Sequence, residues 1–161
     1  MSETAQTSWG MEYTIRTCPK RFAREFQAIF PDIDPENALI VPTCQNSVND
    51  LAATGEAVDK EKDELLEKFS EWATAVCASL QKENHWADFI DPCSGLPMIH
   101  KNYNCPYGEV EGMSVLLGYE TANAAGCKII LHPRWGSKIY PATLFTTGPR
   151  EALERALSSA N

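Results

Sequence analysis

Residues Trp86–Leu96, WADFIDPCSGL, do more than any other stretch to decide the fold of this chain. A short buried strand opens the segment, with its apolar bulk supplied by Trp86, Phe89 and Ile90. Pro92 lacks a backbone N–H and restrains Asp91 to extended geometry, so the strand must end there. Gly95 permits a turn geometry that other residues avoid. We therefore predict a strand and a tight turn, with Asp91 accepting hydrogen bonds from its own turn.

The segments before this strand alternate between strand and helix patterns. Residues 11–17 alternate as a strand, and a helix follows from Pro19 to Phe30, since proline suits a first helical turn. Residues 38–45 form a compact apolar run that predicts a strand, with Pro42 indicating an edge position or a bulge. Residues 56–82 carry the strongest helical pattern, an apolar stripe opposite a Lys- and Glu-rich face.

The segments after the turn are mostly strands. We predict a loop at 97–112, strands at 114–119 and 126–132, and a strand at 138–146 that pairs back as a hairpin partner. A last helix follows at 149–158. Strands that cluster late with short connections favour an α+β fold, with a mixed, mostly antiparallel sheet and helices packed on it. We expect a flexible N-terminal tail at 1–10 and a single globular domain at 11–161.

Composition excludes several classes of protein. The 161 residues carry a net charge of -8, whereas binding to nucleic acid needs a concentrated basic face. No run of 18 apolar residues predicts a membrane span, and the first ten residues resemble neither a secretory signal nor a mitochondrial presequence. Met1 can still be the cut end of a longer natural protein. The six cysteines include no Cys-x-x-Cys pair, so reduced thiols in a cytoplasmic protein are expected.

The sequence also lacks the usual enzyme signatures. It has no phosphate-binding loop, no dinucleotide-binding glycine pattern and no G-x-S-x-G nucleophile elbow. The three histidines are far apart and none lies at metal-ligand spacing from another, which favours structural or exposed roles for His85, His100 and His132.

Cys127 carries the most distinctive chemistry. It opens an apolar strand just after Gly126, Ala124 and Ala125 leave the approach sterically bare, and Lys128 supplies a nearby ammonium. A partly ionised thiol is a soft ligand that suits a transition metal. The alternative is that Cys127 alternates inward with Ile129 and simply packs, because free cysteine is often buried.

Four strings resemble the family of the methylmalonic aciduria and homocystinuria type D protein, the cblD family. They occur in the family's order over roughly residues 12–147: TCPKRFAREFQAIFP (17–31), LLEKFSEWATAVCASL (65–80), WADFIDPCSGL (86–96) and LGYETANAAGCKIILHPRWG (117–136). The resemblance implies a modified nitro-FMN-reductase-like sandwich that has lost flavin binding and enzyme activity. Family members also have a long N-terminal extension that carries mitochondrial targeting, so a mitochondrial form is expected if the natural chain has an upstream presequence.

The resemblance further implies a non-enzymatic adaptor in cobalamin (vitamin B12) trafficking. Such proteins bind the cblC-type cobalamin-processing chaperone and route the cofactor toward methionine synthase and methylmalonyl-CoA mutase. A family cysteine at this place supplies sulfur to the cobalt held by the partner, so cobalamin is the expected cofactor, held jointly with that partner, and no FMN is expected. No membrane partner is expected.

One departure affects the candidate site. Animal members of the family have two adjacent cysteines here, of which the first is the ligand, whereas this chain has Gly126-Cys127. Either Cys127 takes over as metal ligand, supported by Ala125, Gly126 and Lys128, or the partner is bound without sulfur ligation. We expect Trp135 and Gly136 near this surface. The competing hypotheses are a flavin-dependent nitroreductase-like oxidoreductase and a scaffold without a cofactor.

Overall fold

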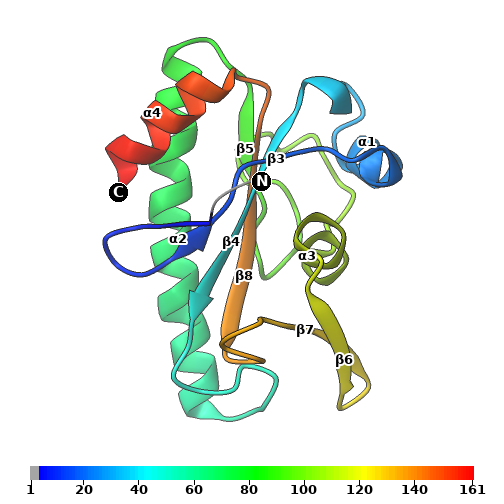
Figure 1. The fold of residues 1–161 in the computed structure, drawn as a ribbon, viewed down its shortest axis with the longest axis vertical. Helices are drawn as coiled ribbons and strands as arrows, with labels where there is room; N and C mark the ends of the chain where they lie inside the picture. Colours follow the sequence, from blue (N-terminus) through cyan, green and yellow to red (C-terminus); the bar gives the residue numbers. More distant parts are fainter. Residues whose placement is uncertain (1–3) are drawn as a thin grey trace.

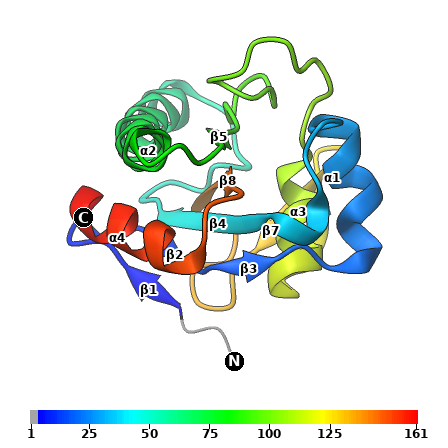
Figure 2. The same cartoon turned by 90° about the horizontal axis from the view of Figure 1, so that it is seen from above.

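A central sheet with helices on both faces forms the body of the molecule (Figures 1 and 2). The computed structural model describes residues 4–161. The strands follow the order β1 (Ala5–Gln6), β2 (Glu12–Tyr13), β4 (Leu39–Asn46), β8 (Ile139–Thr146) and β5 (Ala87–Phe89), and β3 (Arg16–Thr17) also pairs with β4. All of these pairs are antiparallel, so the predicted α+β class is confirmed.

The first residues add a strand to one edge of this sheet. Within the predicted N-terminal tail, Ala5 pairs with Tyr13 and the Thr7 side chain is buried. Thr7 Oγ1 accepts a hydrogen bond from the Met11 N–H at 3.0 Å, which closes the turn between β1 and β2. The rest of the predicted tail, residues 1–3, lies outside the described residues.

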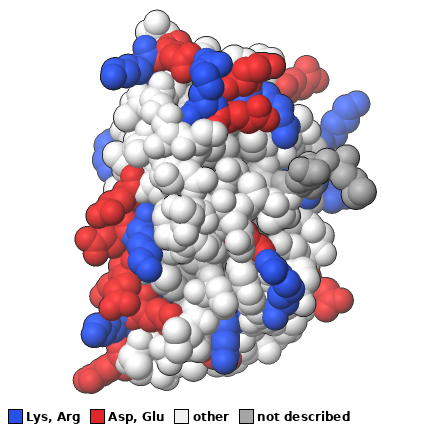
Figure 3. Space-filling model, turned by 60° about the vertical axis from the view of Figure 1, so that its left-hand side comes forward, with Lys and Arg blue, Asp and Glu red and all other residues white. Residues whose placement is uncertain are grey.

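One face of the sheet is covered by α2 (Glu56–Lys82) and α4 (Arg150–Ala160). Phe69 and Trp72 of α2 are buried against sheet residues that include Val41 and Leu144. Each such aromatic side chain contributes roughly 1.5–3 kcal/mol by leaving water. The bounds of α2 match the prediction from its apolar stripe. Figure 3 shows charged side chains gathered over α2 and α4, whereas the middle of that face carries few.

The other face is covered by the turn η1 (Lys20–Phe22), α1 (Ala23–Ile29) and α3 (Glu109–Leu117), and η2 (Pro35–Asn37) leads into β4. Aromatic rings fill this layer: Phe30 contacts Phe145 of β8 with ring centroids 5.0 Å apart, and Tyr107 contacts Phe145 at 5.3 Å. Edge-to-face arrangements of this kind stabilise a core beyond the area that they bury.

Pro42 lies in a central strand, so its predicted edge or bulge position is wrong. β4 pairs with β8 on one side, and β2 and β3 flank it on the other in one continuous register, from Glu12 opposite Cys44 to Thr17 opposite Leu39. Thr14 donates its N–H to the Pro42 carbonyl at 3.3 Å, but proline has no N–H to return. Because this one hydrogen bond is missing at Pro42, β2 and β3 are two short strands, but both keep the same register with β4.

Two predictions for the region after the turn are also wrong. Residues 114–119 belong largely to α3, which ends at Gly118 in the left-handed conformation with φ +69°, a common helix C-cap. The predicted hairpin between residues 126–132 and 138–146 does not form. β7 (Cys127–Leu131) pairs instead with β6 (Glu120–Ala124) in a separate two-stranded sheet, because β4 and β5 already occupy both edges of β8.

The strand and turn at 86–96 form as predicted. Asp91 accepts hydrogen bonds from the Cys93 N–H at 3.1 Å and from the Ser94 hydroxyl at 3.0 Å. Gly95 closes the turn with φ +76° and donates to the Asp91 carbonyl at 2.7 Å. The last helix, α4, also agrees with the predicted helix at 149–158 within two residues at its end.

Candidate functional site

Cys127 lies beside a tight turn at the tip of the β6–β7 hairpin. Ala124 pairs with Cys127, which leaves Ala125 and Gly126 as a two-residue loop with φ of +51° and +80°. Two left-handed residues in succession are typical of a type I′ hairpin turn, whose twist matches that of the strands. In Figure 1 this hairpin extends away from the central sheet, next to α3.

The Cys127 side chain is exposed, so the alternative in which it packs inward is wrong. Ile130 is the residue of β7 that is buried, in contact with Met113 of α3. A Cβ atom added to Gly126 would meet no heavy atom within 4 Å, which confirms that the approach to the tip is sterically bare. The thiol can therefore be reached by a large partner.

The other cysteines lie in different surroundings. Cys44 and Cys77 are buried, and burial raises the pKa of each thiol. Burial and the nearby Glu25 carboxylate raise the pKa of Cys18 to about 11, so the helix terminus beside it does not activate this thiol. Cys93 is exposed, but its pKa is raised by partial burial and by Asp91.

The residues predicted to support Cys127 are only partly brought together. Lys128 follows it and forms an ion pair with Glu111 of α3, with Nζ and Oε1 2.8 Å apart. Trp135 and Gly136 lie in the turn after β7, at the opposite end of that strand, which places them roughly 16 Å from the tip along a strand that rises about 3.3 Å per residue. The expected grouping of Trp135 and Gly136 with Cys127 is therefore wrong.

A mostly apolar hollow of about 230 Å³ lies on the inner side of β7. Its lining includes Lys128, Ile129 and Ile130 of β7, Tyr140 of β8 and Glu109 at the start of α3. Glu109 Oε2 accepts a hydrogen bond from the Thr143 hydroxyl at 2.7 Å, while Oε1 is buried without a partner among the described residues. Burial raises the pKa of Glu109 to about 7.

A second buried acid, Glu12, holds the turn after β7. His132 Nδ1 accepts the N–H groups of Arg134 and Trp135 at 3.0 and 3.2 Å. The proton of this imidazole therefore lies on Nε2, which donates to Glu12 Oε2 at 3.0 Å. Arg134 also pairs with Glu12, and the Trp135 ring stacks on His132 with centroids 4.2 Å apart. Both nitrogens of His132 are thus occupied, which confirms a structural role.

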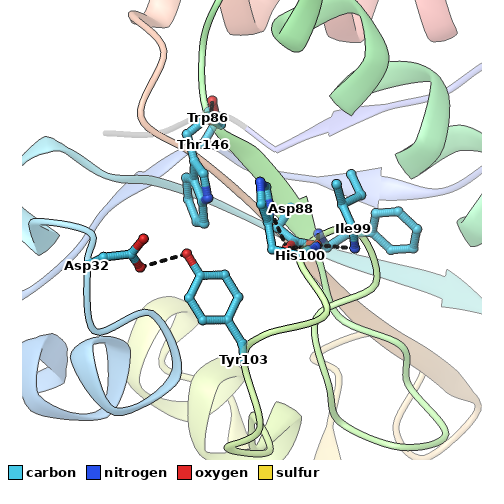
Figure 4. Close-up of polar contacts among 8 residues, drawn as sticks. Asp32, Trp86, Asp88, Ile99, His100, Tyr103 and Thr146 are labelled. Atoms are coloured by element: carbon cyan, nitrogen blue, oxygen red, sulfur yellow. Dashed lines mark hydrogen bonds and ion pairs between the residues drawn. The ribbon is translucent and has the colours of Figure 1, made fainter.

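A third polar cluster, drawn in Figure 4, surrounds the fully buried Asp88 of β5. Asp88 accepts hydrogen bonds from the Ile99 N–H at 2.9 Å, from the His100 N–H at 3.0 Å and from His100 Nδ1 at 2.8 Å. Nearby, the Tyr103 hydroxyl donates to Asp32 at 2.7 Å. These bonds anchor the loop after the 86–96 turn, so Asp88 and His100 also have structural roles.

No sequence pattern predicted that Glu109, Glu12 and Asp88 would be buried acids. Only Asp88 had a visible signal, since it interrupts the apolar run of its strand. Within residues 4–161, no three His, Cys, Asp or Glu side chains are grouped closely enough to hold a metal ion. Across the same residues, none of the helices has the length and apolar character needed to cross a membrane.

The structure thus defines an α+β protein that presents a thiol at a hairpin tip, beside an apolar hollow with a buried acid. The chain belongs to the methylmalonic aciduria and homocystinuria type D protein family, whose model matches residues 1–156, so the resemblance is confirmed. It is 34% identical to the human cobalamin trafficking protein CblD over 145 residues, which is 90% of this chain and 49% of the relative.

Two further relatives carry the same name. The identity is 32% over 151 residues with the mouse protein, covering 94% of this chain and 51% of the relative, and 28% over 158 residues with the chicken protein, covering 98% and 53%. The chain therefore spans about half the length of the curated relatives it matches.

Proposed function

We propose that this chain is a non-enzymatic adaptor in cobalamin trafficking, which presents the Cys127 thiolate to the cobalt of a cobalamin held by a cblC-type chaperone. The observation that carries the proposal is the exposed thiol of Cys127 on a hairpin that stands clear of the sheet. The name shared by the relatives supports cobalamin as the cargo.

The chemistry of Cys127 suits this role. A thiolate is a soft ligand for a transition metal, so Cys127 would supply one sulfur donor to the cobalt of the cargo. One sulfur from this chain is then sufficient, in agreement with the lack of a multi-residue metal cluster within residues 4–161. Gly126 adds no side chain at the tip, and open space surrounds it, so the residue before Cys127 leaves room for a bulky cargo.

The proposal extends to partners, location and fold relationship. The adaptor would deliver its partner's cargo toward methionine synthase and methylmalonyl-CoA mutase, in the cytoplasm or, with an upstream presequence, in the mitochondrion. Its α+β sheet would be a modified nitro-FMN-reductase-like sandwich. The flavin-dependent alternative has no support from the names of the family or of these relatives.

The test mixes the protein with a cobalamin-loaded cblC-type chaperone and records the cobalt absorption spectrum together with complex formation. We expect a complex and a spectral shift that Cys127→Ser abolishes. Cys93→Ser, which changes another exposed thiol, is the matched control and should retain the shift. If no complex forms with the unaltered protein, the adaptor function is wrong; if a complex forms without a shift that depends on Cys127, sulfur ligation is wrong.

A further inference from the structure

The β6–β7 hairpin has a free strand edge close to Cys127. Because Ala124 pairs with Cys127 around a two-residue turn, these two residues exchange backbone hydrogen bonds, and bonded pairs then alternate along the two strands. Thr121 and Asn123 of β6 therefore direct their N–H and C=O groups away from β7. β6 pairs with no other strand, and no hydrogen bond joins these backbone groups to any other residue in 4–161.

Among residues 4–161, the other strand edges are less open. The strands β1, β3 and β5 at the margins of the central sheet have only two or three residues, and such short strands resist the addition of a further strand. On the free side of β7 the outward backbone groups belong to Lys128 and Ile130, and Ile130 is buried. β6 has five residues with no proline, lysine or bulge, and Asn123 is exposed. Its edge is thus accessible and lacks the features that usually protect one.

The two faces of the hairpin differ in chemistry. Lys128 forms an ion pair with an acid of α3, and Ile130 is buried against the same helix, so their face of the hairpin lies toward α3. Cross-strand pairing puts Thr121 and Asn123 on that face as well. The opposite face, called the outer face below, carries six residues, none of them buried: Glu120, Ala122, Ala124, Cys127, Ile129 and Leu131. Apart from Glu120 this outer face is uncharged and mostly apolar.

These features specify what can occupy the edge of β6. Its outward backbone groups recur about every 6.8 Å, two residues of a strand, and an extended backbone offers donors and acceptors at the same spacing. Because side chains alternate along a strand, the residues opposite Ala122 and Ala124 should be apolar. Those opposite Thr121 and Asn123 should be polar. The residue opposite Glu120 should be basic, since opposite charges on paired strands attract each other.

We infer that the free edge of β6 is a docking site for an extended segment of a partner protein, which adds to the hairpin as a third, antiparallel strand. That segment alternates apolar and polar residues and places a basic residue at Glu120. Neighbouring strands are about 4.8 Å apart, so the added strand lies roughly 10 Å from β7, and its apolar side chains extend the outer face that carries Cys127. The inference concerns the edge of β6, and it does not depend on ligation of cobalt by Cys127.

The test titrates the full chain with the acetylated pentapeptide amide Val-Thr-Val-Thr-Lys, whose lysine lies opposite Glu120 in the antiparallel register. The ¹H–¹⁵N resonances of Thr121 and Asn123 are followed, and we expect both to shift to saturation. N-methylation of the two threonines blocks the peptide N–H groups that face β6 and should weaken binding by at least about tenfold. N-methylation of the two valines, whose N–H groups face away, is the matched control and should preserve binding. Equal losses from the two methylated peptides, or no shift of β6 with the unmodified one, would overturn the inference.

Two variants of the protein give a second readout. Asn123→Pro removes an outward N–H group but no hydrogen bond to β7, so the hairpin should persist while peptide binding weakens by about tenfold. Asn123→Ala keeps the N–H group and should bind the peptide as the unaltered protein does. Peptide binding that survives Asn123→Pro at full strength would sink the assignment. If proline disrupts the hairpin, the methylated peptides still decide the question.

Two further arms test the nature of the partner. Glutamate in place of the peptide lysine should weaken binding about threefold at low salt, and equal affinity would overturn the preference for a basic residue. A dilution series without peptide tests a second copy of this chain as the occupant. Shifts of Thr121 and Asn123 that depend on protein concentration would assign the edge to self-association and overturn docking of a partner. Because the readout is β6 and not the cobalt spectrum, failure here is distinguishable from failure of the proposed adaptor function.

Discussion

Asp88 binds both the backbone and the ring of His100. Its Oδ2 accepts one hydrogen bond from the His100 backbone N–H at 3.0 Å and a second from the ring Nδ1 at 2.8 Å. The Asp88 carboxylate is fully buried, so these bonds replace the water that it loses on folding. Hydrogen bonds to a charged group contribute about 1.5–3 kcal/mol each, and a buried group that loses its partner costs more than the bond is worth. The loop after the 86–96 turn therefore depends on this one side chain.

We expect Asp88→Asn to lower the free energy of unfolding by at least about 2 kcal/mol, because an amide turns one acceptor into a donor that faces other donors. Urea denaturation followed by circular dichroism would measure the change. Asp91→Asn is the matched control, three residues away in a solvent-accessible turn, and should cost less than about 1 kcal/mol. Equal losses from the two substitutions would contradict the anchoring role of Asp88.

Gly112 allows Tyr107 to pack against α3, which predicts an unusual response to alanine. Alanine in a helix interior is normally favoured over glycine by about 1 kcal/mol. At Gly112, however, an added Cβ would lie 1.9 Å from the Tyr107 hydroxyl oxygen and 2.7 Å from the ring, and Tyr107 is itself buried. We expect the clash to prevail, with Gly112→Ala lowering the unfolding free energy by about 1–3 kcal/mol.

Gly108→Ala is the control for this prediction. The nearest atom to a Cβ at Gly108 is 3.9 Å away and its backbone is not left-handed, so the change should stay within about 0.5 kcal/mol. Thermal or urea denaturation of the two variants side by side gives the comparison. A stabilised Gly112→Ala variant would show that helix propensity outweighs the packing of Tyr107.

Glu109 should make stability depend on pH. Burial raises its pKa from 4.5 to about 7, so between those values the folded protein holds a proton that the unfolded chain has lost. Stability from this group is therefore complete below pH 4.5, falls as pH rises through the window, and is constant above pH 7, with a total change of about 3 kcal/mol. The amide variant Glu109→Gln does not titrate and should lack this slope.

The measurement is the difference in unfolding free energy between Glu109→Gln and the unaltered protein at pH 5 and at pH 8. Burial raises the pKa of the neighbouring Tyr107 well above its ordinary value, so this phenol stays neutral over the range and cancels in the difference. We expect the free energy of unfolding of Glu109→Gln to increase relative to that of the unaltered protein as pH rises. A difference that is independent of pH would mean that Glu109 is solvated and ionises normally.

The cysteines should react with a thiol reagent at very different rates in the folded protein. Cys127 and Cys93 are exposed, whereas Cys44 and Cys77 are buried and react only when the structure opens. We expect iodoacetamide to modify the two exposed thiols first, with the buried ones protected by at least about 100-fold, as mass spectrometry of timed digests would show. Modification of Cys77 at the rate of Cys127 would contradict the burial of α2 against the sheet.

Sequence patterns predicted the local elements better than their pairing. The helix Glu56–Lys82 follows from a long apolar stripe, and the turn at Asp91 follows from proline and glycine, since both signals act within a few residues. The apolar segment at 114–119 fits helix and strand equally well, and only its packing on β7 and β8 decides for a helix. The pairing of β7 was missed because competition for the edges of β8 involves strands that lie far apart in the sequence.

The same limit applies to the site. Sequence alone marked Cys127 as chemically distinctive, but alternation along the strand left its exposure open until the turn at Ala125 and Gly126 fixed which residues face out. The buried acids could not be paired in advance, because Glu12 meets His132 across 120 positions and Glu109 meets Thr143 across 34. Such partners are set by the tertiary fold.

Ala125 gives a last prediction, because it holds a left-handed conformation that favours glycine and asparagine over alanine. With φ +51°, an alanine here costs roughly 1 kcal/mol relative to a residue that tolerates this region. Asparagine followed by glycine is the preferred pair for a type I′ turn. Ala125→Asn should therefore stabilise the hairpin by up to about 1 kcal/mol, and Ala125→Val, with its β-branched side chain, should destabilise it by more than that.

The effect should reach global stability, since Ile130 ties the hairpin to Met113 of α3 and is itself buried. Urea denaturation of the three proteins would rank them as Asn, Ala and Val in order of falling stability. If Cys127 is the cobalt ligand, the hairpin must also keep its shape for the thiol to reach the metal, so Ala125→Val should weaken the cobalt spectral shift while Ala125→Asn retains it. Identical stability in all three would mean that the turn conformation at Ala125 is not maintained in solution.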